Sequence, residues 1–237
     1  LIFCPTKEAV TNLENEKFSL NIPIQSASQQ HPYIEIVGDI MLDNTLYFSE
    51  LAVQNSKILH ELELEEDFIL ATCHRPVNTD NEESINTIFS SLLELAESEN
   101  MYCILPIHPR TKKMYDKLID SNLKNQIAHS KYFNMIEPVS YIDMVHLESK
   151  AKMIVTDSGG VQKEAFFLRK PCIVLREETE WVELVENGNA VLTGSNHDKI
   201  RKAYIELENR ELTYPDFYGK GNSAEIISKT IQEFFEK

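Results

Sequence analysis

The chain has 237 residues, of which 42 % are hydrophobic and 26 % are charged, and its formal net charge is −15. This mix is typical of a globular protein with one large or two small domains. The acidic balance excludes general affinity for nucleic acid or for anionic membranes. No run approaches the roughly 18 apolar residues of a membrane-spanning helix, and the opening LIFCPTKEAV lacks the basic start of a signal peptide. We therefore expect a cytoplasmic protein with no nucleic-acid or membrane partner.

The chain begins without a methionine and in the middle of a pattern, because apolar LIFC is followed at once by Pro5 and Thr6. We expect this run to be the last strand of a domain whose earlier part is missing, and the chain to be a fragment. The stretch PIQSASQQHPY is polar and typical of a linker or a sheet edge. Residues 1–45 are thus expected to be the remnant of an N-terminal domain and a linker.

Between residues 46 and 217, apolar strands alternate with amphipathic helices. The expected strands are continuous apolar runs at 68–73, 102–107, 132–136, 152–156 and 172–175, with one more after 190. The expected helices cover 85–96, 111–120 and 140–149, another begins at Gly160, and one more follows the last strand and runs to about 208. Beyond this range, a final helix is expected at 223–235. Asp80 and Glu83 have the spacing of a capping box before the first of these helices. Strands that are apolar on both faces predict a parallel sheet covered by helices on both sides, an α/β Rossmann-like, doubly wound domain.

The cysteines and most histidines carry no chemical signal. The four cysteines are widely spaced without a CxxC motif, and the last three fall in or beside predicted strands. They are therefore expected to be reduced, buried and apolar in behaviour, and no metal site is predicted. Cys73 precedes His74, but neighbours on a strand point to opposite faces, so a Cys-His nucleophile is discounted.

Polar groups follow four of the predicted strands. In open α/β sheets, ligands bind beyond the carboxyl ends of the strands, so these groups should converge on one rim. They are His74-Arg75, His108-Pro109-Arg110, Glu137-Pro138 and Asp157-Ser158-Gly159-Gly160.

The stretch VTDSGGVQKEA places Ser158, Gly159 and Gly160 at the start of a helix and Glu164 one turn further in. Bare glycines and unpaired helix amides suit a phosphate. A carboxylate one turn in would repel phosphate, but it can accept hydrogen bonds from the two hydroxyls of a ribose. The pattern therefore indicates a nucleotide site. The alternative, with about equal weight from the residues alone, is a tight strand-to-helix turn with a capping serine.

Eight blocks of the sequence form a recognisable set: FCPTKEAVTNL, VGDIMLD, HRPVN, PIHPRT, EPVSYIDM, TDSGGVQKEA, KPCIVLREETEWVE and YGKGNSAEII. In order and spacing, these blocks resemble the non-hydrolysing UDP-N-acetylglucosamine 2-epimerase family. The resemblance covers nearly the whole chain, and TDSGG-x-Q-x-EA is its most specific part.

The resemblance implies a glycosyltransferase-B-type fold with two Rossmann-like domains, of which this chain would be the C-terminal half. Residues 218–237 would form a helix that packs back towards the N-terminal domain. The family removes the proton at sugar carbon 2, expels UDP to leave a bound glycal, then restores both, with no NAD or metal cofactor. The acidic residues that handle this proton lie on the family's first domain. The partner implied is a UDP-sugar, and the full-length protein would be a homodimer.

By motif match, Ser158, Gly159, Gly160 and Glu164 would hold UDP, and His74 would sit beside the diphosphate as the catalytic residue. A histidine and helix amides aimed at that phosphate favour the charge that builds there. Further possible substrate contacts are Arg75, Asn78, His108, Glu137, Arg176, Thr179 and Glu180. His108 and Arg110 could instead form a second, regulatory anion site or a plain loop.

Two departures bear on the substrate. The family often continues its HR motif with x-E-N, whereas this chain continues with Pro76, Val77 and Asn78. Val77 thus stands where the family motif has its glutamate. The sequence ETEWVE replaces TTERPE and resembles the branch that acts on UDP-2,3-diacetamido-glucuronate sugars. The alternatives to an epimerase are a glycosyltransferase of the same architecture, which needs an acceptor, and a non-catalytic UDP-binding module.

Overall fold

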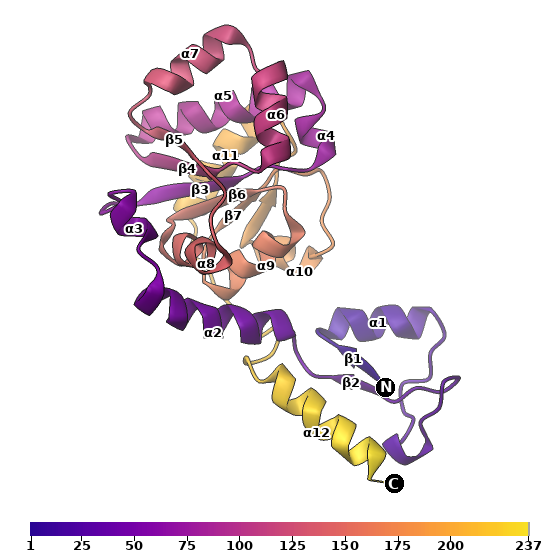
Figure 1. The fold of residues 1–237 in the computed structure, drawn as a ribbon. Coiled ribbons are helices and arrows are strands. Elements are labelled where there is room, and N and C mark those ends of the chain that lie inside the picture. Colours follow the sequence, from indigo (N-terminus) through magenta and orange to yellow (C-terminus); the bar gives the residue numbers. More distant parts are fainter. Residues whose placement is uncertain (237) are drawn as a thin grey trace. The chain divides into compact units, whose positions relative to one another are not determined.

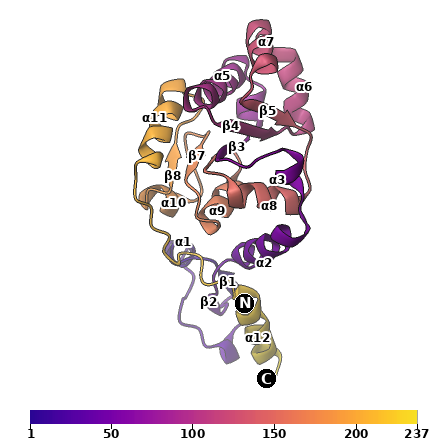
Figure 2. The ribbon, with the colours of Figure 1, turned by 90° about the vertical axis from the view of Figure 1, so that its left-hand side faces the viewer.

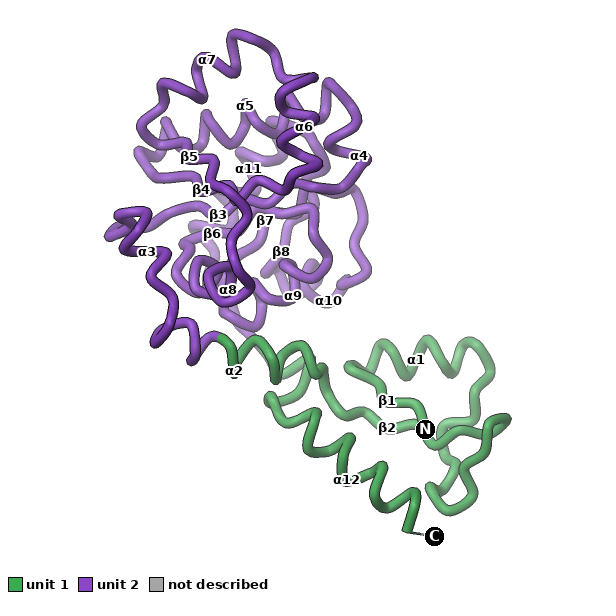
Figure 3. The backbone as a smooth tube through the Cα atoms, viewed as in Figure 1, with its two compact units in different colours: residues 1–48, 215–237 green, residues 49–214 purple. Residues whose placement is uncertain are grey.

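The computed structural model describes residues 1–236. The chain divides into two compact units, shown in different colours in Figure 3. One unit takes residues 1–48 together with the chain from Pro215 onwards, and the other takes Ser49–Tyr214.

The unit of residues 49–214 is built on a six-stranded sheet in which all neighbouring strands are parallel (Figures 1 and 2). Its spatial order is β5-β4-β3-β6-β7-β8. The strands are β3 (Phe68–Thr72), β4 (Tyr102–Pro106), β5 (Phe133–Ile136), β6 (Met153–Thr156), β7 (Cys172–Val174) and β8 (Ala190–Leu192). From β3 the chain adds strands first in one direction and then, from β6, in the other. The topological switch point, where such folds bind ligands, therefore lies between β3 and β6.

Helices cover both faces of this sheet, as the alternating pattern predicts. The helices of the unit are α3 (Ile58–Glu61), α4 (Pro76–Thr79), α5 (Glu82–Glu99), α6 (Pro109–Leu118), α7 (Ser121–His129), α8 (Tyr141–Lys150), α9 (Gly159–Phe167), α10 (Val182–Glu186) and α11 (His197–Glu208). Helices α5 and α11 pack on one face, and α8 and α9 on the other (Figures 1 and 2). The predicted α/β, Rossmann-like class is confirmed.

The core follows the period-two alternation of the strands. Ile69 and Ala71 of β3 and Met153 and Val155 of β6 join one apolar cluster with the inward face of α5. These residues are almost completely buried. Burying apolar surface contributes about 25 cal/mol per Å² to stability, and burial on both faces is the main stabilisation of a parallel sheet.

The predicted capping box of Asp80 and Glu83 is wrong. The N-cap of α5 is Asn81, whose side-chain oxygen accepts a 2.8 Å hydrogen bond from the amide of Ser84. Asp80 instead ends α4 and forms an ion pair with Arg110, with 2.5 Å between Oδ2 and Nη2. Two residues able to cap stand side by side here, and the arginine on α6 engages the first of them.

The unit formed by the two chain ends contains a short parallel pair, β1 (Ile2–Cys4) and β2 (Ile34–Ile36). The helix α1 (Lys7–Asn15) and the 3-10 turn η1 (Ile24–Ser26) connect them. The expectation that LIFC is the last strand of its domain is therefore wrong, because β2 follows it and pairs with it. Thr6 caps α1 by accepting a hydrogen bond from Ala9.

Helices α2 (Ile40–Asn55) and α12 (Ser223–Phe235) are joined in this unit by a carboxylate. Asp43 accepts hydrogen bonds from the amides of Ser223 and Ala224, at 3.1 and 2.8 Å, which satisfies the start of α12. Gly38 has a φ of +83°, and a Cβ there would lie 2.7 Å from the carbonyl oxygen of Tyr218. A larger residue at position 38 would therefore separate the two ends of this unit. Within residues 1–236, no helix has both the length and the apolar character needed to cross a membrane.

Candidate functional site

The loops that follow β3 and β6 meet at the switch point of the sheet. β3 leads directly to Cys73, His74 and Arg75, and β6 leads to Asp157 and the glycine-led helix α9. The two strands are hydrogen-bonded neighbours, with Thr72 paired to Thr156 at their carboxyl ends. This pairing places the HR motif beside the DSGG motif.

Asp157 joins these two loops. Its side chain is fully buried and accepts hydrogen bonds from the amides of His74 (3.0 Å) and Arg75 (2.8 Å) and from Nδ2 of Asn78 (3.0 Å). The Nδ1 atom of His74 lies 3.5 Å from the same carboxylate. Hydrogen bonds to a charged acceptor are about twice as strong as neutral ones. Asp157 therefore fixes the backbone that carries the histidine.

His108 and His74 lie side by side at the ends of β4 and β3, with 6.1 Å between their ring centroids. Nδ1 of His108 accepts a hydrogen bond from the amide of Arg110, so His108 caps α6. A pocket of about 160 Å³ lies among these strand ends. Its lining residues are Thr72, Cys73, His74, Pro106, His108, Pro138, Val139 and Met144. The predicted convergence on one rim is confirmed for the ends of β3, β4, β5 and β6.

The start of α9 presents two amides that the helix itself cannot satisfy. Ser158 is the N-cap, and its hydroxyl accepts a 3.5 Å hydrogen bond from the amide of Val161. The amides of Gly159 and Gly160 belong to the first turn, where N–H groups have no acceptor within the helix. With the partial positive charge of a helix start, they form a site suited to a phosphate.

The glycine at position 159 is not required by the backbone. It is not among the glycines with positive φ. A Cβ at Gly159 would make ordinary contacts, 3.5 Å from Nε1 of Trp181 and 3.7 Å from a carboxylate oxygen of Glu180. Because the fold itself would accept alanine here, the missing side chain leaves the helix start open to a ligand.

Glu164 lies one turn into α9 and is nearly buried, with 7 % of its surface exposed. Its Oε1 atom accepts a 3.2 Å hydrogen bond from the hydroxyl of Tyr141. Burial raises the pKa of Glu164, while the bond from Tyr141 and the charge of Lys163 act in the opposite direction. The carboxylate is therefore a basic acceptor with one donor already in place.

A second carboxyl group, that of Glu148 on α8, lies close to Glu164. It is fully buried, and neither of its oxygens has a hydrogen-bond partner. Burial raises the pKa of Glu148 well above its usual value, and the charge of Glu164 raises it further. Both carboxyl groups therefore hold a proton more tightly than an exposed glutamate, and Glu148 more so than Glu164, because only Glu164 has Tyr141 and Lys163 to stabilise its charge.

The loop between β7 and α10 borders the start of α9. Arg176 and Glu180 form a bidentate pair in this loop, with N–O distances of 2.7 and 2.8 Å. The bonds from Arg176 lower the pKa of Glu180 to about 2. Thr179 donates a 2.6 Å hydrogen bond to Oε1 of Gln162 on α9. The loop thus brings a permanent anion and a cation to the helix start.

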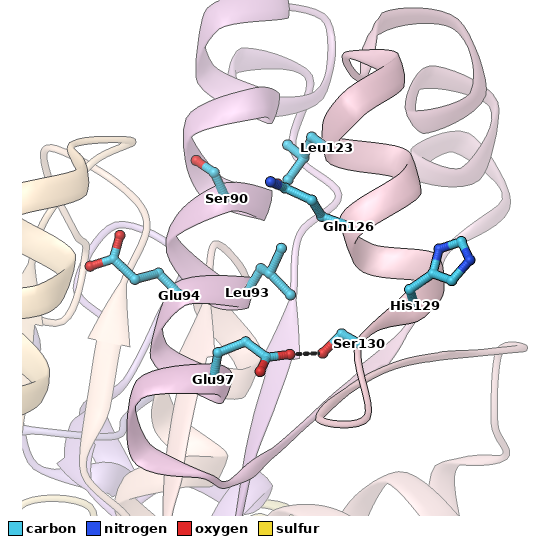
Figure 4. Close-up of a pocket in the computed structure, with 8 residues that line it drawn as sticks. All are labelled: Ser90, Leu93, Glu94, Glu97, Leu123, Gln126, His129 and Ser130. Carbon is cyan, nitrogen blue, oxygen red and sulfur yellow. Dashed lines mark hydrogen bonds between the residues drawn. The ribbon is translucent and has the colours of Figure 1, made fainter.

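Another hollow, of about 500 Å³, lies between α5 and α7 (Figure 4). Its lining residues are Ser90, Leu93, Glu94, Glu97, Leu123, Gln126, His129 and Ser130. Glu97 accepts a hydrogen bond from Ser130 across it (Figure 4). Two carboxylates on its wall make it unsuited to a nucleotide. Within the described part of the chain, no cluster of three or more histidine, cysteine or acidic side chains could hold a metal ion.

The family model for UDP-N-acetylglucosamine 2-epimerases matches residues 1–232. The chain belongs to this family.

Individual members of the epimerase family match over almost the whole chain. A UDP-N-acetylglucosamine 2-epimerase homolog of Methanococcus maripaludis is 39 % identical, over 98 % of this chain and 60 % of that protein. The UDP-2,3-diacetamido-2,3-dideoxy-D-glucuronate 2-epimerase of Pseudomonas aeruginosa is 36 % identical, over 98 % of this chain and 59 % of that protein. The chain therefore spans about 60 % of the length of these relatives.

The solved structures of the epimerase family have the same fold. The Methanocaldococcus jannaschii UDP-GlcNAc 2-epimerase in complex with UDP-GlcNAc and UDP superimposes with a TM-score of 0.83 at 35 % identity. The match covers 98 % of this chain and 60 % of that one. The predicted glycosyltransferase-B-type class and the family resemblance are both confirmed.

The residues selected from the sequence fall into two groups in the structure. His74, Arg75, Asn78, Ser158 and the two glycines surround Asp157, and His108 is next to His74. Arg176, Thr179 and Glu180 lie in the loop against α9. Glu137 is exposed at the end of β5, and its side chain is not in the strand-end pocket.

Three side chains were missed as parts of this site. The sequence identifies Asp157 as a polar residue at a strand end, and its position directly after a buried strand is the signal for its structural role. Trp181 is the sole tryptophan of the chain, and that rarity was also a signal. Glu148 gave none, because a glutamate near the end of an amphipathic helix is ordinarily exposed.

Proposed function

We propose that this chain is the UDP-binding portion of a non-hydrolysing UDP-N-acetylglucosamine 2-epimerase. The observation that carries the proposal is the arrangement at the switch point. Two free helix amides lie one turn from the nearly buried Glu164, beside the histidine that Asp157 holds in place. Phosphate and ribose are the two parts of a nucleotide that such groups would bind.

The proposed division of roles follows from charge. The amides of Gly159 and Gly160 and the hydroxyl of Ser158 would bind the diphosphate, and Glu164 would accept hydrogen bonds from the ribose hydroxyls. Expelling UDP from carbon 1 of the sugar builds negative charge on the phosphate. His74 and the helix start are directed at that charge, and preorganised donors of this kind stabilise a transition state by about 3 to 4 kcal/mol each.

The substrate would be UDP-N-acetylglucosamine, converted to UDP-N-acetylmannosamine, or a 2,3-diacetamido-uronate relative of it. The Pseudomonas aeruginosa relative is named for a 2,3-diacetamido-uronate sugar, which supports retaining both substrates as candidates. Thr179 and Glu180 are the proposed sugar contacts, with Arg75, Asn78, His108, Glu137 and Arg176 as further candidates for contacts to the substrate. The groups that handle the carbon 2 proton are proposed to lie in the part of the relatives that this chain does not cover.

We also propose that residues 46–217 form the nucleotide-binding domain and that the gene product is a cytoplasmic homodimer. The compact unit of residues 49–214 supports the proposed bounds of the nucleotide-binding domain. The four cysteines are all buried and unpaired, which suits a reducing compartment. The homodimer rests on the family resemblance.

Trp181 offers a direct test of nucleotide binding, because the indole of this sole tryptophan contacts Gly159 in the first turn of α9. UDP should change its fluorescence in a saturable way, and uridine should bind more weakly. Turnover is tested on the gene product that contains this sequence, incubated with UDP-N-acetylglucosamine in deuterated water without any acceptor. Deuterium at carbon 2 is the expected result. A reaction that occurs only after an acceptor is added would identify a glycosyltransferase instead.

A further inference from the structure

The side chain of Trp181 is attached to the first turn of α9. Its indole Nε1 donates a 2.8 Å hydrogen bond to the carbonyl oxygen of Gly159. The loop that carries it is held to the same helix by the 2.6 Å bond from Thr179 to Gln162. The amide of Trp181 in turn donates to the hydroxyl of Thr179, at 3.2 Å.

The indole ring is also fixed from the helix side. The ammonium group of Lys163 lies 4.3 Å from the ring centroid. Lys163 has only 7 % of its surface exposed, so this cation–π contact is largely shielded from water. Trp181 is thus held by its N–H, by its ring and by its own backbone.

The carbonyl that Trp181 binds belongs to the peptide unit that carries the Gly160 amide. Because a peptide is planar and trans, the C=O of Gly159 and the N–H of Gly160 point in opposite directions from one plane. Both flanking residues are glycines, which restrict the rotation of this plane least. Holding the carbonyl on one side therefore directs the amide on the other.

A donor on the carbonyl also strengthens the amide. Hydrogen bonds in a chain polarise one another, so an amide whose carbonyl is already bound is a better donor. The same contact therefore fixes the direction of the Gly160 amide and increases its strength towards an anion.

We propose that Trp181 is a positioning residue that holds the Gly159–Gly160 peptide in the orientation that binds a phosphate oxygen of the nucleotide. This inference rests on the proposed function of the site and adds a residue to it. Trp181 acts through the peptide and leaves the ribose and the base to other groups. Its loss should therefore weaken the binding of a nucleoside diphosphate but not of the nucleoside.

The test compares UDP with uridine on the chain as it is, by isothermal titration calorimetry and saturation-transfer NMR. Trp181→Phe keeps an aromatic ring over Lys163 and removes the indole donor. Because the chain has one tryptophan, a tryptophan auxotroph can also place benzothienylalanine at 181, which replaces the N–H by sulfur in nearly the same shape. Val182→Ala changes the exposed neighbouring residue and serves as the control.

Both changes at Trp181 should lower UDP affinity about three- to tenfold, the loss of one ordinary hydrogen bond, and leave uridine affinity unchanged. The ¹⁵N shift of Gly160 should move in both and stay constant in Val182→Ala. Unchanged UDP affinity, or an equal loss for UDP and uridine, would overturn the inference while leaving the proposed function in place. Wild-type protein that binds neither compound would overturn both.

Discussion

Replacing Glu148 by glutamine should stabilise the unit of residues 49–214, increasingly so as the pH rises. The wild-type side chain is fully buried, and neither carboxyl oxygen has a partner. Its pKa is raised well above the usual value, first by burial and then by the charge of Glu164. Burial without a hydrogen-bond partner favours the neutral form of a carboxyl group.

The sign and size follow from proton linkage. In the unfolded chain Glu148 loses its proton near pH ~4.3, whereas in the folded chain it keeps the proton to a higher pH. The contribution to stability is therefore complete below pH ~4.3 and is lost as the pH rises towards the folded pKa. The loss is about 1.4 kcal/mol per pH unit over that window. Glutamine has nearly the same shape and is neutral at every pH, so the variant escapes this loss.

Urea unfolding between pH 4.5 and 8, followed by Trp181 fluorescence, measures the difference within the correct unit. Near pH 4.5 the two proteins should have similar stability, because the wild-type acid is still neutral. Glu148→Gln should then gain on the wild type with each pH unit, while the exposed control Glu186→Gln should not. A difference that stays constant with pH, or a wild type that becomes the more stable protein, would show that Glu148 is ionised and paired.

Two further predictions concern activity. In the gene product that contains this sequence, His74→Ala should slow the turnover of UDP-N-acetylglucosamine by about 100-fold or more, as the loss of one preorganised donor does, with an unchanged circular dichroism spectrum. A normal rate in the folded variant would leave His74 without a catalytic role. The chain of 237 residues alone should bind UDP weakly and incorporate no deuterium at carbon 2, because one side of a cleft cannot exclude water or position a base on the other. Proton NMR in deuterated water over a day checks this, and deuterium at that carbon would place the base within these residues.

The sheet could be predicted because each of its central strands is a continuous apolar run with a turn signal after it. FILATC and KMIVT are short and rich in β-branched or aromatic residues, and these two features favour a buried strand over a buried helix segment. The pairing of β1 with β2 was missed for the opposite reason. Its strands β1 and β2 are three residues long, and their pairing depends on contacts across a polar connection of about thirty residues. Neither propensity nor periodicity detects such a pair.

Features of the candidate site that follow from the order of residues along the chain could be predicted. Contacts between residues from different elements could not. Ser158 and the glycines must begin a helix after a strand, so their sequence is sufficient to place them. Asn81 rather than Asp80 caps α5 because Asp80 keeps the helical backbone of the end of α4, whereas Asn81 is extended. The indole of Trp181 reaches Gly159 through the path of a loop, which local sequence does not define.

The central claim is that Glu164 and the glycine-led helix start hold the ribose and phosphate of UDP. The most direct measurement is the calorimetric affinity of wild type and Glu164→Gln for UDP and for 2′-deoxy-UDP. Wild type should prefer UDP, and the variant should lose about 1.5 to 3 kcal/mol of UDP binding, roughly ten- to a hundredfold, together with that preference. Because the pKa of Glu164 is raised by burial, wild-type affinity should also fall on acidification before an ordinary glutamate would titrate. A wild-type protein that binds UDP and 2′-deoxy-UDP equally would contradict the account.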